Sequence, residues 1–207
     1  MRHPTLVAPT AVLTIVLAGC ASDGGNQAAS SSESSSGTSG PTNVAELTAP
    51  LNDPEGTRVG NAIFTDTVNG TQVRVEASGL PPGFHGMHLH EVGVCEPNSA
   101  DPSDPSQTGN FLSAGPHLGS ADGPHPQHTG DLPTLEVNAR GFGSTSSLMR
   151  VENLEDLLKG DGTSLIIHAD PDNLAHIPPR YPPGGPDQET QKAGDSGARI
   201  ACGVLGH

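Results

Sequence analysis

Histidines are the residues of this chain best suited to chemistry. The chain has ten, and eight of them fall between His85 and His176. Imidazole is a ligand for copper and zinc, and it can exchange a proton near neutral pH. A single histidine is more often a surface or structural residue, but a cluster this dense favours a metal site.

The pair His88-x-His90 is the first candidate for chelation. The segment around it alternates like a strand, which predicts His88 and His90 on one face and Met87 and Leu89 on the other. Two imidazoles about 7 Å apart on one strand can approach one ion from two sides. The same pattern also fits a polar strand face, so the pair does not decide the function by itself.

Further candidate ligands follow along the chain. A segment without strand pattern carries three histidines and a carboxylate, namely His117, His125, His128 and Asp131. His168 directly follows the apolar run 165–167, which predicts that its side chain points into a site at the end of a buried strand. Imidazoles alone favour Cu(II), whereas three imidazoles with one aspartate favour tetrahedral zinc. Only two residues separate His125 from His128, so either both reach one ion or only one does.

Short strands must position these side chains. Alternating apolar and polar residues, with turn signals at Asn69-Gly70 and residues 140–143, predict an antiparallel sandwich or barrel. The predicted strands are residues 59–65, 73–77, 86–92, 135–139, 144–151, 165–167 and 200–205. One helical turn is expected at residues 153–158. Residues 95–131 and 170–197 fit no regular element, and loops of that length are usually functional.

The composition agrees with a small β domain. Glycine and proline number 27 and 20, hydrophobic residues make up 32% of the chain, and tryptophan is absent. A large helical core is therefore not expected, whereas long ordered loops use glycine and proline in turns. The net charge of −14 argues against nucleic acid as a partner, because phosphate binding needs clustered cations.

The N-terminus predicts export and a membrane anchor. Residues 1–19 combine Arg2 with an apolar run at residues 11–18, and their last three residues together with Cys20 form a Leu-Ala-Gly-Cys pattern that resembles the bacterial lipoprotein signal. Cys20 would then carry lipid and hold the protein at the outer face of the cell membrane. Residues 20–42 are rich in serine and glycine and read as a flexible linker, which leaves residues 43–207 as the folded domain.

Two cysteines remain if Cys20 is lipidated. Cys95 and Cys202 are expected to pair in an oxidising compartment. A bridge over that separation restrains the unfolded chain by roughly 4–5 kcal/mol in the entropy model.

Four segments together resemble the copper/zinc superoxide dismutases. Residues 83–91 (GFHGMHLHE) resemble the first signature of that family, and residues 113–117 (SAGPH) resemble its bridging-histidine segment. Residues 128–132 (HTGDL) are similar to its zinc segment, and residues 194–204 (GDSGARIACGV) to its C-terminal signature. The resemblance covers about residues 44–206 and implies an eight-stranded Greek-key antiparallel β-barrel with two long functional loops.

The resemblance also implies two adjacent metal sites. The copper ligands would be His88, His90, His117 and His168. The zinc ligands would be His117, His125, His128 and Asp131, with the imidazole of His117 bridging the two metals. The family usually has a longer excursion between the first and last of these zinc histidines, so the shortened loop leaves a copper-only site as the alternative.

Other matched positions would support the reaction. Asp172 would link a copper histidine to a zinc histidine and orient both. Arg199 would hold superoxide beside the copper and Lys192 would guide it there, while Cys95 and Cys202 match the family disulfide. His85 matches a structural histidine, and no role is implied for His176 or His207.

The activity implied is dismutation of superoxide to oxygen and hydrogen peroxide by Cu(II)/Cu(I) cycling, with Arg199 and His117 as catalytic residues. It would protect the cell envelope from external superoxide. A copper-buffering lipoprotein without catalysis is the alternative, although Arg199 has no purpose in storage. A zinc hydrolase is a weaker alternative, because no Asp or Glu near His88-x-His90 has the spacing of a general base. Family members occur as monomers and as dimers, so a homodimer is compatible with the sequence.

Overall fold

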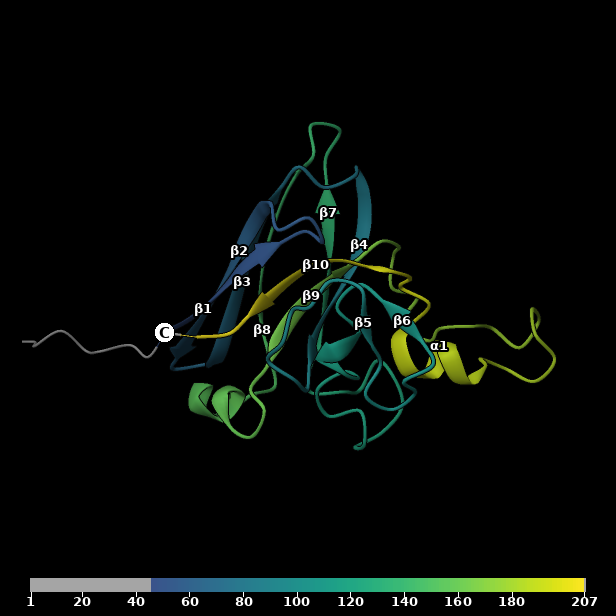
Figure 1. The fold of residues 1–207 in the computed structure, drawn as a ribbon. Coiled ribbons are helices and arrows are strands. Elements are labelled where there is room, and N and C mark those ends of the chain that lie inside the picture. Colours follow the sequence, from purple (N-terminus) through teal and green to yellow (C-terminus); the bar gives the residue numbers. More distant parts are fainter. Residues whose placement is uncertain (1–45, 207) are drawn as a thin grey trace, which may run out of the picture. The chain divides into compact units, whose positions relative to one another are not determined.

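The computed structural model describes residues 46–206. Within that range, eight strands form a closed antiparallel barrel in the order β1-β10-β9-β4-β7-β8-β3-β2, and β5 and β6 form a separate hairpin (Figure 1). The strands are β1 (Glu46–Asn52), β2 (Arg58–Thr67), β3 (Gly70–Ser78), β4 (Gly83–His90), β5 (Ser99–Ala100), β6 (Thr108–Gly109), β7 (Asp131–Val137), β8 (Phe142–Leu148), β9 (Ser164–His168) and β10 (Arg199–Val204). The helical elements are the 3-10 turns η1 (Leu112–Ala114) and η2 (Leu154–Leu158) and the α-helix α1 (Gln188–Ala193). The predicted fold class is confirmed.

Alternation of side chains builds the barrel core. In β3, Thr71, Val73, Val75 and Ala77 point inward and are buried, while the residues between them are exposed. All seven strands predicted from the sequence exist, with ends that differ by a few residues. The first hairpin turn is formed by Val68 and Asn69, one residue earlier than expected, and Gly70 opens β3 with a φ of 110°.

The Greek-key connections bring distant segments together. β4 lies between β7 and β9, and β9 also pairs with β10. The register places His88 opposite Ile166 across β4 and β9, and Arg199 opposite His168 across β10 and β9. Residues 78 and 31 positions apart in the sequence are therefore paired across the two edges of β9.

The two long connections are more structured than predicted. Residues 95–131 contain β5, β6 and η1, and residues 170–197 contain α1, so the expectation that they hold no regular element is wrong. Strands of two residues and a helix of six are too short to leave a periodic pattern. Asp187 caps α1 by accepting a hydrogen bond from the Thr190 amide at 2.9 Å. The β5–β6 hairpin and α1 both lie outside the barrel (Figure 1), and residues of both line one cavity.

The predicted disulfide is present and ties one long connection to the barrel. Cys95 bonds to Cys202 on β10 with a Cα–Cα distance of 5.7 Å. None of the helices between residues 46 and 206 has the length and apolar character needed to span a membrane. The predicted leader, Cys20 and linker lie outside the described residues.

Candidate metal centre

Four histidines converge at the side of the barrel where β4 and β9 adjoin. One nitrogen from each of four buried imidazoles lies within 4.8 Å of the others, in the set His88, His90, His117 and His168. β4 supplies two of them because residues i and i+2 share a face, and Met87 and Leu89 point into the barrel core as predicted. β9 ends at His168, and His117 is held against His90 by an isolated β-bridge.

The two ring nitrogens of each of these four histidines have different surroundings. One nitrogen of each is hydrogen-bonded: His88 Nε2 to Asp172 at 3.0 Å, His90 Nδ1 to the Gly115 carbonyl at 2.8 Å, His117 Nδ1 to Asp131 at 3.0 Å and His168 Nδ1 to the Gly197 carbonyl at 3.1 Å. The other nitrogen of each is buried and has no hydrogen-bond partner in the protein. Buried nitrogens are rarely left unpaired, and metal-binding histidines typically donate their second ring N–H to an oxygen. These four nitrogen donors therefore fit a copper ion coordinated by nitrogen alone.

A second set of ligand atoms adjoins the first. His117, His125, Asp131 and also His88 place one ligand atom each within 4.8 Å of one another. His125 Nδ1 is buried and lies 3.1 Å from Asp131 Oδ2. The shortened loop thus still delivers His125 to the carboxylate.

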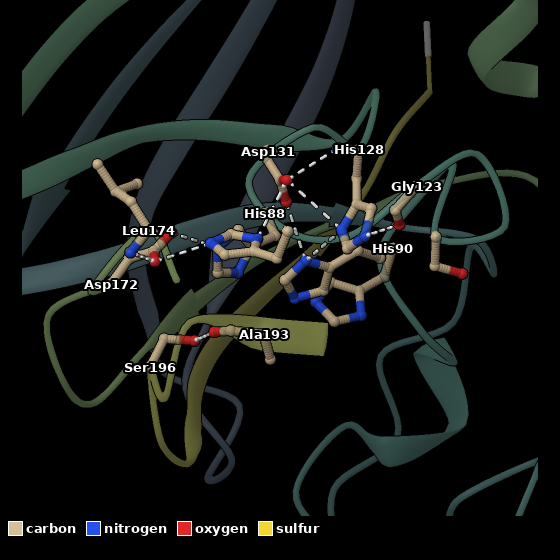
Figure 2. A network of polar contacts seen from close by, with 12 residues as sticks. His88, His90, Gly123, His128, Asp131, Asp172, Leu174, Ala193 and Ser196 are labelled. Atoms are coloured by element: carbon tan, nitrogen blue, oxygen red, sulfur yellow. Dashed lines mark hydrogen bonds and ion pairs between the residues drawn. The ribbon is translucent and has the colours of Figure 1, made fainter. Parts of the chain in front are cut away.

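His128 lies at the edge of this second set. It is not one of its four members, but His128 Nδ1 is 3.4 Å from both Asp131 Oδ2 and His117 Nδ1. The His128 Nε2–H donates to the Gly123 carbonyl at 3.0 Å (Figure 2). This bond would fix the tautomer that leaves Nδ1 free, so three imidazoles and one carboxylate fit a zinc ion.

Asp172 joins the two sets. Its Oδ2 accepts a hydrogen bond from His88 Nε2 at 3.0 Å, and its Oδ1 accepts from His125 Nε2 at 2.8 Å and from the Leu174 amide at 2.7 Å. Figure 2 shows Asp172 and Asp131 at different sides of the imidazole cluster. One carboxylate therefore sets the ring orientation of a residue in each set.

Burial keeps the four imidazoles of the first set neutral. Loss of hydration lowers the pKa of His88, His90 and His168, and it lowers the pKa of His117 to about 3 against the opposing effect of Asp131. Neutral imidazole is the form that binds metal, so burial prepares these groups for coordination.

His125 differs from the others because two carboxylates face its ring. Burial lowers its pKa, but hydrogen bonds and charge interactions with Asp131 and Asp172 outweigh burial and raise the pKa to about 9. Burial raises the pKa of both carboxyl groups, yet their histidine partners prevail and hold each pKa well below its usual value. In the metal-free protein at neutral pH, His125 is therefore a cation between two carboxylates.

Arg199 stands beside the first set at the start of β10. Its guanidinium donates to the Phe111 carbonyl at 2.6 Å and to the Gly115 carbonyl at 2.8 Å. Gly115 also accepts the His90 hydrogen bond, so one carbonyl orients both side chains. Burial lowers the pKa of Arg199 to about 10, which leaves it charged at neutral pH with further N–H groups for an anion.

A cavity of about 1020 Å³ leads to these residues. Its lining includes His117, His168 and Arg199, and Lys192 of α1 lies at the same cavity. It also includes His128, so the cavity reaches both sets of ligand atoms. Every predicted site residue within the described range is thus part of this centre or its surroundings, apart from the disulfide cysteines.

Two supporting features were not found from the sequence. Gly194 ends α1 with a φ of 58°, and a Cβ there would lie 2.0 Å from Asp172 Oδ1, so no larger residue fits over the carboxylate. The second feature is the pair of backbone carbonyls of Phe111 and Gly115, which a pattern of side chains cannot reveal.

His85 is buried with its ring nitrogens 2.8 Å and 2.9 Å from the carbonyls of His168 and Pro81, in keeping with a structural role.

Comparisons with known proteins point to one family. A family model described as copper/zinc superoxide dismutase (SODC) matches residues 58–205. The protein named Superoxide dismutase [Cu-Zn] from Mycobacterium tuberculosis is 42% identical over 168 residues, which cover 77% of this chain and 70% of that protein. Its counterpart of the same name from Deinococcus radiodurans is 35% identical over 169 residues, covering 76% and 82%.

A solved structure agrees with the sequence relatives. The Cu/Zn superoxide dismutase from Brucella abortus is 27% identical, has a TM-score of 0.60, and covers 77% of this chain and 99% of its own. The similarity therefore extends over almost the whole of that protein's fold.

Proposed function

Because this chain belongs to the copper/zinc superoxide dismutase family, we propose that it converts superoxide to oxygen and hydrogen peroxide at the centre described above. The observation that carries this function is the convergence of four neutral imidazoles beside Arg199. Each imidazole presents one buried nitrogen without a protein partner. The family uses copper and zinc, and the two ligand sets fit those metals.

We assign the copper site to His88 Nδ1, His90 Nε2, His117 Nε2 and His168 Nε2, because these are the buried nitrogens without a partner. Zinc would be held by the Nδ1 atoms of His117, His125 and His128 and by the carboxylate of Asp131. His117 would thus contribute one ring nitrogen to each ligand set.

Bound copper would supply the Cu(II)/Cu(I) couple through which one superoxide is oxidised and a second is reduced. The rest of the reaction depends on residues of the chain. Arg199 binds superoxide by a charge-assisted hydrogen bond from the N–H groups that its carbonyl partners leave free. Lys192 adds positive charge on the path of entry, since the protein as a whole carries −14 and repels anions.

Two protons must reach the peroxide product. His117 is placed to hold one of them at Nε2, because Nδ1 remains engaged on the Asp131 side and Nε2 faces the copper set. Its burial lowers its pKa to about 3, so at neutral pH the ring carries one proton and is not converted to imidazolium. The second would come from solvent.

The proposed cellular location, outside the cell at the membrane, rests on the signal predicted for residues 1–19. A lipidated Cys20 would hold the domain on the outer face of the membrane, where it meets superoxide from outside the cell. Metabolic labelling with a fatty acid should mark the wild-type protein and not a Cys20→Ala variant. Equal labelling of both would contradict the anchor.

One experiment separates dismutation from copper buffering. The full chain is loaded with copper and zinc, and superoxide decay is followed together with the yield of oxygen and hydrogen peroxide. A dismutase gives one oxygen and one peroxide for two superoxide ions at a rate proportional to protein. Tight copper binding with uncatalysed decay would leave only the buffering function.

A further inference from the structure

The cavity above Arg199 has an unexpected charge balance for a path that admits an anion. Its charged lining residues are three acids, Asp101, Asp104 and Glu189, against two cations, Lys192 and Arg199. Its volume of about 1020 Å³ also leaves room for anions much larger than superoxide. Size alone therefore does not select the substrate, and charge at the guanidinium has to contribute.

Asp101 is fixed in place by a turn that follows β5. Asp101 Oδ1 accepts hydrogen bonds from the Ser103 amide at 2.7 Å, the Ser103 hydroxyl at 2.6 Å and the Asp104 amide at 3.3 Å. The Asp101 amide donates to the Gln107 carbonyl at 3.0 Å across the hairpin. Burial opposes ionisation, but these hydrogen bonds prevail and keep the pKa of Asp101 below its usual value. The carboxylate is thus a permanent negative charge in a defined position.

The segment that holds Asp101 also holds Arg199. Ser99, at the start of β5, accepts a hydrogen bond from the Ser113 amide at 3.0 Å, and the Phe111 amide donates to the Glu96 carbonyl at 2.9 Å. Phe111 in turn provides a carbonyl that orients Arg199. The negative charge of Asp101 opposes the lowering of the Arg199 pKa by burial. The carboxylate and the guanidinium therefore share one rigid support and feel each other's charge.

We propose that Asp101 is a specificity-determining residue that weakens the binding of anions at Arg199, and that it weakens dianions more than monoanions. The Coulomb energy scales with the charge of the ligand, so a dianion is repelled twice as strongly as a monoanion at the same place. Asp101 would keep Arg199 free of sulfate- or phosphate-like dianions while costing little for superoxide. The link to superoxide rests on the proposed function, whereas the effect on anion affinity does not.

Asp101→Asn is the test substitution because the Asn side-chain oxygen can accept the same turn hydrogen bonds. The full chain is loaded with copper(I) and zinc, which are diamagnetic, and the Arg199 Nε–H resonance is titrated with sulfate and separately with nitrate at constant ionic strength. We expect nitrate affinity to rise about 2- to 3-fold and sulfate affinity about 4- to 9-fold, the square of the nitrate factor.

Two further variants separate local charge from other effects. Asp53→Asn removes one charge from another turn, where Asp53 Oδ1 accepts from the Thr57 amide at 2.7 Å, and it should leave both affinities unchanged. Asp101→Glu keeps the charge but alters the turn, and it should bind sulfate as weakly as wild type. If Asp101→Asn gains no sulfate affinity, gains equally for both anions, or behaves like Asp101→Glu, the proposal is overturned. The titration contains no superoxide, so its failure is distinct from a failure to dismutate.

Discussion

Asp172→Asn should weaken the binding of both metals at once. The carboxylate receives the His88 N–H on Oδ2, and the N–H groups of His125 and Leu174 on Oδ1. An asparagine offers one oxygen and one NH2 group. The oxygen is best placed toward the two donors of His125 and Leu174, which leaves the NH2 group facing the His88 N–H.

The magnitude follows from that mismatch. An unsatisfied buried donor costs about 1–3 kcal/mol, and loss of a partner behind a ligand typically weakens metal binding about 10- to 100-fold. We therefore expect copper affinity to fall within that range. Zinc should fall by less, because His125 keeps an acceptor.

Competition with chelators of known affinity measures the effect for each metal separately. Asp131→Asn should reduce zinc affinity more than copper affinity, because it alters a zinc ligand, while Asp170→Asn, at an exposed carboxylate two residues from Asp172, should affect neither metal. Wild-type affinity for both metals in Asp172→Asn would refute the orienting role. So would a loss confined to zinc.

Three further predictions concern substrate binding, pH and the disulfide. Arg199→Ala should keep its copper but lose about 10- to 100-fold in kcat/KM for superoxide, because a charge-assisted hydrogen bond of about 1.5–3 kcal/mol is removed. The metal-free protein holds a proton on His125 up to about pH 9, so zinc affinity should fall about tenfold for each pH unit below that value, measured by competition titration. With the sign worked out, the charged His125 stabilises the metal-free fold fully below pH 6.5, and this contribution is lost as pH rises through about 9. Reduction of Cys95–Cys202, or a Cys95→Ser/Cys202→Ser double variant, should lower stability by about 2–5 kcal/mol in denaturant unfolding.

Each of these predictions has an outcome that contradicts it. Unchanged turnover and salt dependence in Arg199→Ala would remove the arginine from substrate binding. A zinc affinity independent of pH between 7 and 9 would mean that His125 carries no proton to displace. Equal unfolding midpoints for the oxidised and reduced protein would show that the bridge does not stabilise the fold.

The part of the site carried by strand pattern was predictable from the sequence. The two-residue period placed His88 and His90 together on one face and Met87 and Leu89 in the core, as the structure has them. The apolar run before His168 likewise predicted a buried strand that ends at the site. These inferences worked because burial enforces the alternation of side chains along a strand.

β1 shows where the pattern fails. Leu47, Ala49 and Leu51 alternate inward, but Pro50 lies between them and argues against a strand. The barrel accepts it because Pro50 points outward and is exposed, and β1 is paired in register with β10 only at Asn52 and Cys202. Tertiary context, not local sequence, makes this segment a strand.

The support of the site was the least predictable part. Arg199 and Asp101 are held by backbone groups of residues 96–115. Every residue has a backbone carbonyl, so the sequence does not mark the ones that form these hydrogen bonds. The zinc side is similar, because the compressed loop left both arrangements of His125 and His128 open. Only the folded loop shows that both rings approach Asp131.

The central claim is that one copper ion among His88, His90, His117 and His168 dismutates superoxide. Its most direct test is the rate of superoxide decay as copper is added stepwise to the zinc-loaded full chain. The rate should rise linearly with added copper and stop rising at one copper per chain. Uncatalysed decay at full copper occupancy, or a rate that continues to rise beyond one equivalent, would contradict it.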